Sequence, residues 1–201
     1  MNLKKLLIAT AGAGLMAGSF VTVQAQDLGG TLKKIKDTNT ITIGYRKSSI
    51  PFSFLDDKQQ PVGYAIDLCM KIVDTVKADL KLPNLKVAMQ PVTSSNRIPL
   101  LRNGTIDLEC GSTTNSKVRQ EQVSFGPSYF VINVTAAVKK SSNINTLADL
   151  NGKTISTTSG TTSVPLLKGY KKTENIQVKE IYGKDHACLL YTSPSPRDRQ
   201  K

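Results

Sequence analysis

The chain has 201 residues, with 27 basic and 15 acidic side chains and a net charge of +12 at neutral pH. With a single histidine there is no metal-ligand spacing, so no metal or other cofactor is expected. The lysines are scattered along the sequence and only 5% of residues are aromatic, whereas surfaces that bind nucleic acid have clustered basic residues. No nucleic-acid partner is therefore expected.

The first 25 residues have the pattern of a secretory signal peptide. Two lysines precede an apolar stretch over 6–18, and Val23-Gln24-Ala25 provides small residues for cleavage after Ala25. A membrane anchor is disfavoured because the apolar stretch is shorter than the roughly 20 residues that span a bilayer. No cysteine lies near the cleavage point to carry a lipid. We therefore expect a soluble mature protein in the periplasm of a Gram-negative bacterium.

The last segment, "CLLYTSPSPRDRQK" over 188–201, continues none of the patterns before it. It resembles the translation of a sequencing adapter, so we interpret it as a disordered read-through artefact on a gene fragment. A natural disordered tail is the alternative. The protein remains basic without its two ends.

Helices and strands alternate over the first half of the sequence. A short helix over 30–39, a strand over 40–46 and an extended segment over 50–64 with a turn at Asp56-Asp57 come first. A helix over Tyr64–Leu80 follows and is ended by Pro83. Its apolar residues recur at helical spacing and predict a face packed on a sheet: Ile66, Cys69, Ile72, Val73, Val76 and Leu80.

A strand over 85–92, a helix over 94–104 and a strand "TIDLEC" over 105–110 complete the first set. This alternation predicts a parallel sheet and an α/β fold, in which ligands bind beyond the carboxyl ends of the strands. Polar side chains gather at three such ends: Arg46, Ser94 to Arg97, and Ser112 to Arg119.

The pattern then starts again. A strand-like run over 128–140 precedes a short helix and turn over 145–153, a strand over 154–158 and a glycine turn "SGTTS" over 159–163. A helix to about Lys172 and a strand over 176–182 come next. We interpret this as a second α/β lobe, entered through a hinge strand.

Several motifs together identify a family resemblance. "GYRKSSIPFSF", "VGYAIDLC", "TSSNRIPLLRNGTIDLECGSTTNSKVRQ", "LADLNGKTISTTSGTTS" and "YGKDHA" are similar to periplasmic amino-acid-binding proteins of ABC uptake systems, the family 3 solute-binding type. Within that family the sequence most resembles the branch that binds glutamate and aspartate. The resemblance covers about residues 31–187.

The resemblance implies a two-lobed periplasmic-binding-protein fold of type II. Lobe 1 would be residues 26–128 and a partial lobe 2 residues 129–187, with the second lobe cut short at its carboxyl end. It also implies a monomer that closes on a small acidic amino acid and docks on a membrane ABC permease.

The resemblance further implies which residues bind the ligand. Ser112, Thr114 and Arg119 would hold the amino-acid head group, with Arg119 on the α-carboxylate. Arg46, Ser94 and Arg97 would face the side-chain carboxylate. The second lobe would close over the ligand with the following residues: Ser159, Thr161, Thr162 and His186.

Residue chemistry supports this assignment independently. Three arginines at three strand ends provide for the two carboxylates of a dicarboxylic amino acid, since a guanidinium stays charged and donates two parallel hydrogen bonds. The alternatives are that Arg46 only solvates the surface, and that Ser94 and "SGTTS" only cap helices. His186, the sole histidine, lies two residues before the suspect tail.

Other functions on the same fold are a cyclohexadienyl dehydratase-like enzyme and the ligand-sensing domain of a receptor. An enzyme needs a positioned acid or base, and the expected pocket offers only Glu109, Asp185 and His186. A sensor needs a membrane segment; none is visible in this sequence, although the missing carboxyl-terminal part could contain one. A binding protein, not an enzyme, is therefore expected.

Two cysteines precede the suspect tail. Cys69 lies on the apolar helix face, where a small core residue is expected. In an oxidising compartment Cys110 could pair with Cys69 or with a cysteine beyond this sequence.

Overall fold

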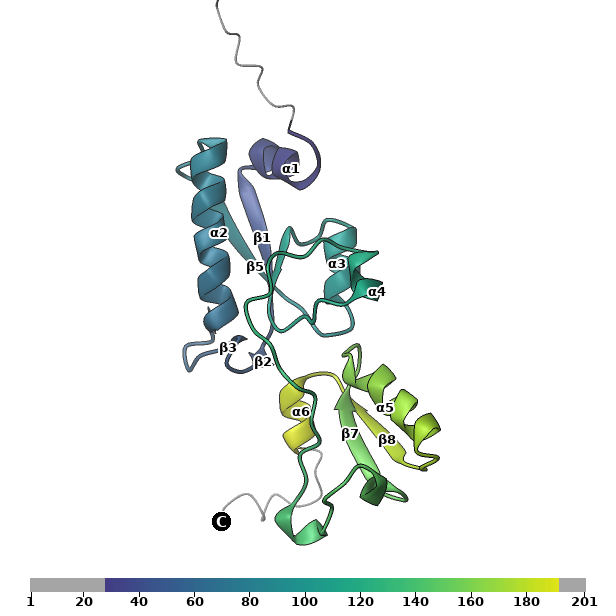
Figure 1. Ribbon diagram of the computed structural model, residues 1–201. Helices are drawn as coiled ribbons and strands as arrows, with labels where there is room; N and C mark the ends of the chain where they lie inside the picture. Colours follow the sequence, from purple (N-terminus) through teal and green to yellow (C-terminus); the bar gives the residue numbers. More distant parts are fainter. Residues whose placement is uncertain (1–27, 192–201) are drawn as a thin grey trace, which may run out of the picture.

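The computed structural model describes residues 28–191, so the expected signal peptide lies outside the described residues. Two α/β lobes follow one another along the sequence (Figure 1). The elements of the first are α1 (Gly30–Thr38), β1 (Thr40–Tyr45), β2 (Ser48–Ser49), β3 (Ser53–Leu55), β4 (Pro61–Val62), α2 (Tyr64–Leu80), β5 (Lys86–Pro91), α3 (Arg97–Arg102), β6 (Leu108–Cys110) and α4 (Lys117–Gln120). Those of the second are η1 (Lys140–Ser142), η2 (Ala148–Leu150), β7 (Thr154–Thr158), α5 (Ser163–Thr173), β8 (Lys179–Gly183) and α6 (His186–Tyr191).

The main sheet of the first lobe is parallel, with the strand order β5-β1-β6. Tyr45, the last residue of β1, lies opposite Pro91 on one side and Cys110 on the other. The three strands therefore end at one edge of the sheet. Their following loops begin side by side there, as the polar clusters in the sequence predicted.

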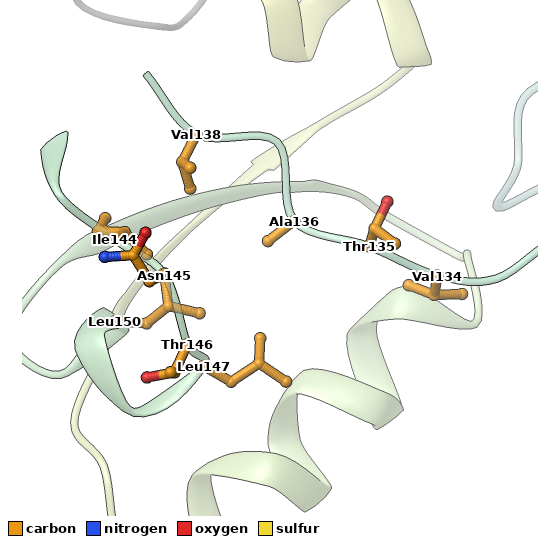
Figure 2. A pocket seen from close by; sticks show the side chains of 9 residues that line it. All are labelled: Val134, Thr135, Ala136, Val138, Ile144, Asn145, Thr146, Leu147 and Leu150. Atoms are coloured by element: carbon orange, nitrogen blue, oxygen red, sulfur yellow. The ribbon is translucent and has the colours of Figure 1, made fainter. Parts of the chain in front are cut away.

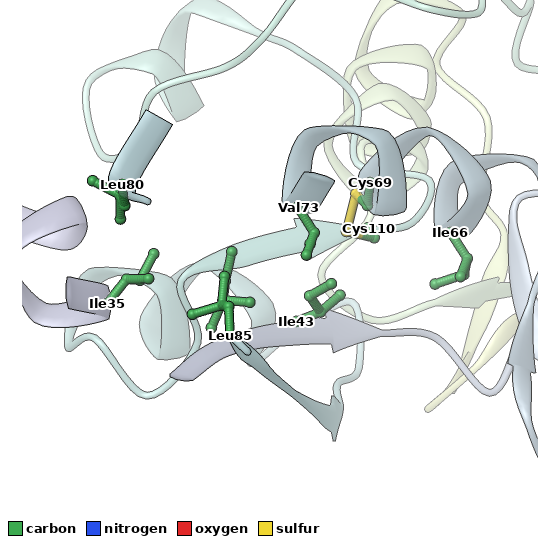
Figure 3. Packing of buried hydrophobic residues seen from close by; sticks show 9 residues of the cluster. Ile35, Ile43, Ile66, Cys69, Val73, Leu80, Leu85 and Cys110 are labelled. Atoms are coloured by element: carbon green, nitrogen blue, oxygen red, sulfur yellow. A yellow bond between two sulfur atoms is a disulfide. The ribbon is translucent and has the colours of Figure 1, made fainter. Parts of the chain in front are cut away.

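Helix α2 packs its apolar face on this sheet (Figure 3), with Ile43 of β1 and Val73 of α2 both at 0% exposure. A methyl group at Gly44 would lie 2.5 Å from Cδ1 of Ile106, so glycine lets that side chain pack against β1. One residue of the predicted stripe is wrong: Ile72 is 47% exposed. The side chain of Ile72 faces solvent, whereas that of the adjacent Val73 faces the sheet and is buried.

A disulfide joins Cys69 of α2 to Cys110 at the end of β6, with Cα atoms 6.2 Å apart (Figure 3). Of the two partners that the sequence left open for Cys110, the structure has Cys69. The bond ties the helix layer to the strand that leads into the Ser112–Arg119 loop.

The second lobe contains a two-stranded parallel sheet of β7 and β8, against which α5 and α6 pack. Strand β8 begins at Lys179, later than the sequence predicted. Helix α6 was not predicted, and it continues through Cys188–Tyr191, part of the tail expected to be disordered. The rest of that tail, residues 192–201, lies outside the described residues.

The strand predicted over 128–140 is not formed; the segment runs as irregular backbone from the first lobe to the second (Figure 1). Tyr129 and Phe130 pack on Phe52 of the first lobe, but Val131 is 88% exposed. A strand needs a partner for its backbone hydrogen bonds, and within residues 28–191 no strand pairs with this segment. High strand propensity alone therefore misled the prediction.

Candidate functional site

Arg46 directly follows β1 and is fully buried, with 0% of its surface exposed. Its backbone N–H donates to Oγ of Ser53 at 2.9 Å, and its Nη1 donates to Oγ of Ser94 at 2.8 Å. Its Nη2 forms an ion pair with Asp185 of the second lobe. A buried guanidinium needs such partners because desolvating a charge is costly. Arg46 is therefore no surface solvating group, and it links the two lobes.

Ser94 lies in the loop between β5 and α3 and is buried. It does not cap the helix: the turn before α3 is closed by Thr93 and Asn96, whose side chains each accept a hydrogen bond from the other's backbone N–H, at 2.7 and 3.2 Å. The Ser94 hydroxyl is instead directed at Arg46. This geometry argues against the simple capping role for Ser94.

Arg97 begins α3 and is 2% exposed. Its Nη1 lies 3.7 Å from Oε1 of Glu109, within ion-pair distance but without a hydrogen bond, and its Nε and Nη1 have no hydrogen-bond partner. Burial lowers the pKa of Arg97 to about 10, against a favourable contribution from Glu109. The group is thus charged at neutral pH and retains donors for another anion.

The loop after β6 carries Ser112, Thr114 and, in α4, Arg119. Oγ of Ser112 is buried without a hydrogen-bond partner. Arg119 donates from Nη1 to the carbonyl oxygen of Thr114 and from Nη2 to that of Gly160, each at 3.0 Å. Burial lowers the pKa of Arg119, and Glu109 opposes that shift. Arg119 therefore also bridges the two lobes.

The glycine turn of the second lobe lies against the first lobe. A methyl group at Gly160 would be 2.7 Å from the carbonyl oxygen of Ser94, and the φ of Gly160 is +75°, so glycine is required twice over. Oγ1 of Thr162 lies 3.5 Å from Oγ1 of Thr114 across the gap, while Thr161 donates to the carbonyl oxygen of Thr158 at 2.7 Å. Thr162 is the N-cap residue of α5 yet makes no side-chain capping hydrogen bond.

His186 begins α6, and its Nδ1 lies 3.2 Å from Oγ of Ser49 in the first lobe. Burial lowers the pKa of His186, the charge on Arg46 lowers it further, and Asp185 opposes both. The imidazole is therefore neutral at physiological pH. It can donate one hydrogen bond and accept another.

The structure brings most of the predicted residues together at one interlobe site. The charges of both Arg46 and Arg119 lower the pKa of Arg97, so the three guanidinium groups lie within reach of one another's fields. From the second lobe, Gly160, Thr162 and His186 contact the first lobe. The backbone N–H of Ser159 and the hydroxyl of Thr161 instead donate within the second lobe, to the carbonyl oxygens of Gly183 and Thr158. That these groups bind a ligand remains a prediction.

Sequence reasoning missed the contact of Ser49, the close approach at Gly160, and the pairing of Glu109 and Asp185 with arginines. Glu109 and Asp185 entered only as potential acids, yet each pairs with a buried arginine. A signal existed for Glu109, since an acid next to the last residue of an apolar strand needs a cation nearby. The contacts of Ser49 and Gly160 depend on lobe docking, which no local pattern encodes.

A separate hollow of about 280 Å³ lies in the second lobe (Figure 2). Side chains of the segments 134–138 and 144–150 line it, and most of them are apolar. It contains none of the predicted site residues. The convergent charges lie at the lobe interface instead, and acidic ligands need such charges.

Residues 28–191 lack two features that would point to another kind of site. No group of three or more potential metal-ligating side chains is found among them. Within the same residues, no helix has the length and apolar character to cross a membrane.

The fold and this site define a class of protein: a two-lobed α/β protein with a charged site at the interface of its lobes. The model of the bacterial extracellular solute-binding proteins, family 3, matches residues 41–190, and the protein belongs to that family.

Comparison with individual proteins of known function agrees with this family membership. The sequence is 46% identical over 187 residues to the L-glutamate/L-aspartate-binding protein of Pseudomonas aeruginosa, and 43% identical over 198 residues to the glutamate/aspartate import solute-binding protein of Salmonella typhimurium. These matches cover 92% and 98% of this sequence and 61% and 66% of the relatives. This protein thus spans somewhat less than two thirds of their length, and both are named as binding proteins.

A solved structure, the cysteine-binding protein of Campylobacter jejuni, superposes with a TM-score of 0.71 at 28% identity. The match covers 84% of this sequence and 65% of that protein. It agrees with the type II periplasmic-binding-protein fold that the sequence predicted.

Proposed function

We propose that this protein captures glutamate or aspartate between its lobes in the periplasm and delivers it to the membrane permease of an ABC importer. The observation that carries the proposal is the convergence of Arg46, Arg97 and Arg119 from three strand ends. The names of its relatives, which bind or import these two amino acids, support the choice of ligand.

The contacts suggest a division of labour among the arginines. Arg97 keeps two donor nitrogens without partners, which suits a direct contact with the side-chain carboxylate. Arg46 already donates to Ser94 and Asp185, so we assign it a second position beside that carboxylate, with its Nε as the nitrogen that has no partner. Arg119, with the hydroxyls of Ser112 and Thr114, is assigned to the α-carboxylate.

The second lobe would complete the enclosure, with Ser159, Thr161, Thr162 and His186 facing the ligand. We place the boundary between lobe 1 (26–128) and lobe 2 (129–187) where the irregular connecting segment begins. Ligand binding would favour the closed arrangement of the two lobes, and that closed form would dock on the permease as a monomer.

Isothermal titration calorimetry with L-glutamate, L-aspartate and L-glutamine tests the proposal. We expect saturable binding of the acidic pair and at least 100-fold weaker binding of glutamine. Equal binding of glutamine and glutamate would contradict it. Cell fractionation tests the periplasmic location.

A catalytic alternative is less well supported. Glu109 and Asp185 both pair with arginines, so neither is a free general base. Nδ1 of His186 lies 3.2 Å from the Ser49 hydroxyl, but Oδ1 of the neighbouring Asp185 accepts from Arg46 and from the backbone N–H of His186, so it does not orient the imidazole as a third group would. We therefore propose that the protein is a binding protein and no enzyme. Chromatography of glutamate or prephenate after incubation with the protein should recover it unchanged.

A further inference from the structure

We propose that Tyr129 is a positioning residue of the interlobe site: its hydroxyl holds the loop that follows β6 (111–116), from which Ser112 reaches the ligand. Tyr129 lies in the irregular segment that connects the two lobes (Figure 1). The sequence predicted only a strand position for it. This inference rests on the proposed binding of acidic amino acids.

The contact of Tyr129 acts directly on the backbone of Ser112. The hydroxyl of Tyr129 donates a hydrogen bond to the carbonyl oxygen of Gly111, the residue between β6 and Ser112. That carbonyl and the backbone N–H of Ser112 belong to one planar trans peptide group, in which they point in opposite directions. A hydrogen bond that fixes the carbonyl of Gly111 therefore also fixes the direction of the Ser112 N–H.

Ser112 depends on its neighbours for its placement. Its Oγ is buried and has no hydrogen-bond partner, so no contact of its own fixes the hydroxyl. The next residue, Thr113, donates to Oε2 of Glu109 at 2.7 Å. The preceding residue, Gly111, is packed so closely that a methyl group there would lie 2.5 Å from Oε1 of the same carboxylate. Ser112 is thus held between two fixed neighbours, and Tyr129 provides the hydrogen bond for one of them.

The ring of Tyr129 is itself fixed on the first lobe. It packs on Phe52, with ring centroids 6.4 Å apart, and edge-on against Tyr64, with centroids 5.8 Å apart. Burial raises the pKa of Tyr129, the charge on Glu109 raises it further, and the charge on Arg97 opposes both shifts. The hydroxyl therefore keeps its proton at neutral pH, and it lies within the fields of two charged groups of the interlobe site.

Tyr129→Phe tests the proposal because it removes the hydroxyl and keeps the ring. Dissociation constants for L-glutamate are measured by calorimetry, and amide hydrogen exchange is followed by mass spectrometry on the ligand-free proteins. We expect glutamate to bind roughly three- to ten-fold more weakly, because the ligand must then order the loop without that hydrogen bond. Exchange over residues 110–114 should become faster, while the midpoint of thermal unfolding changes little.

Tyr64→Phe is the matched control. Tyr64 is 45% exposed and Tyr129 43%, and the two rings are in contact. The hydroxyl that holds Gly111 is that of Tyr129, so removing the hydroxyl of Tyr64 leaves the contact with the loop intact. We expect Tyr64→Phe to change neither the glutamate affinity nor the exchange over 110–114. Equal effects of the two substitutions would overturn the proposal, since the packing of the rings would then be their source.

The outcomes separate this inference from the function itself. A wild-type protein that binds neither glutamate nor aspartate refutes the proposed function, and hydrogen exchange alone then decides whether Tyr129 holds the loop. If the wild type binds glutamate, an unchanged dissociation constant in Tyr129→Phe overturns the positioning role, and so does unchanged exchange over 110–114. Should Tyr129→Phe not fold, Tyr129→Met, which also lacks the donor, must accelerate that exchange, or the proposal fails.

Discussion

Replacing Arg97 with leucine should separate the binding of an acidic ligand from the stability of the fold. Arg97 is 2% exposed, and its Nε and Nη1 lack hydrogen-bond partners. If these donors hold the side-chain carboxylate, their removal leaves that carboxylate buried without a partner. Such a loss costs about 2–5 kcal/mol, or roughly 30- to 5,000-fold in the dissociation constant.

The effect of Arg97→Leu on stability should be small or opposite in sign. Burial lowers the pKa of Arg97 from its usual value to about 10, so below pH 10 the charged group opposes folding by about 3 kcal/mol. Leucine has no such cost, although Glu109 then loses its counter-ion. We expect the ligand-free variant to unfold at a temperature near or above that of the wild type.

Calorimetry with glutamate and glutamine, together with thermal unfolding, checks both parts. Arg102→Leu, on the exposed end of the same helix, is the control and should change neither affinity. A variant of Arg97 that still binds glutamate within a few-fold of the wild type, or that still prefers it over glutamine, would refute the assigned role.

Three other contacts lead to predictions of their own. Replacing Cys69 and Cys110 with alanine should cost about 2–4 kcal/mol in urea unfolding, since the bond closes a loop with a sequence separation of 41; an unchanged midpoint would contradict this. Gly160→Ala should weaken glutamate binding about ten-fold and also lower the ligand-free unfolding temperature, because alanine is strained at a φ of +75° and its methyl group would meet the Ser94 carbonyl; unaltered affinity and stability would show that this contact does not matter. Burial lowers the pKa of His186 in the folded protein, so the unfolded protein binds the proton at a higher pH and the free energy of unfolding should fall as the pH decreases from about 6.5 through the native pKa. His186→Asn should reduce this dependence of stability on pH, and an identical dependence in the variant would rule out the histidine as its source.

The spacing of apolar residues, together with the residues that end helices and strands, was sufficient to predict most elements of the first lobe. The stripe on α2 and the polar residues after β1, β5 and β6 predicted the parallel sheet and the edge where these residues meet, because strand ends in such sheets lie at one side. Helix α3 begins later than predicted, at Arg97, since Thr93 and Asn96 close a turn before it.

Long-range pairing limited the remaining predictions. The 128–140 segment has the composition of a strand, but the partner that a strand requires is not encoded within the segment. Likewise, the interlobe pairs Arg46 with Asp185 and Ser49 with His186 join residues more than 130 positions apart, at 139 and 137. Only the docking of the lobes brings such residues into contact.

The bond between Cys69 and Cys110 couples maturation of the site to its chemical surroundings. It anchors the last residue of β6, from which the loop bearing Ser112 and Arg119 departs, to the middle of a helix. In a reducing cytosol that bond is absent, so the loop is held less firmly. If the protein reaches the periplasm, as proposed, oxidation there fixes the loop, and the proposed ligand site then matures only after export.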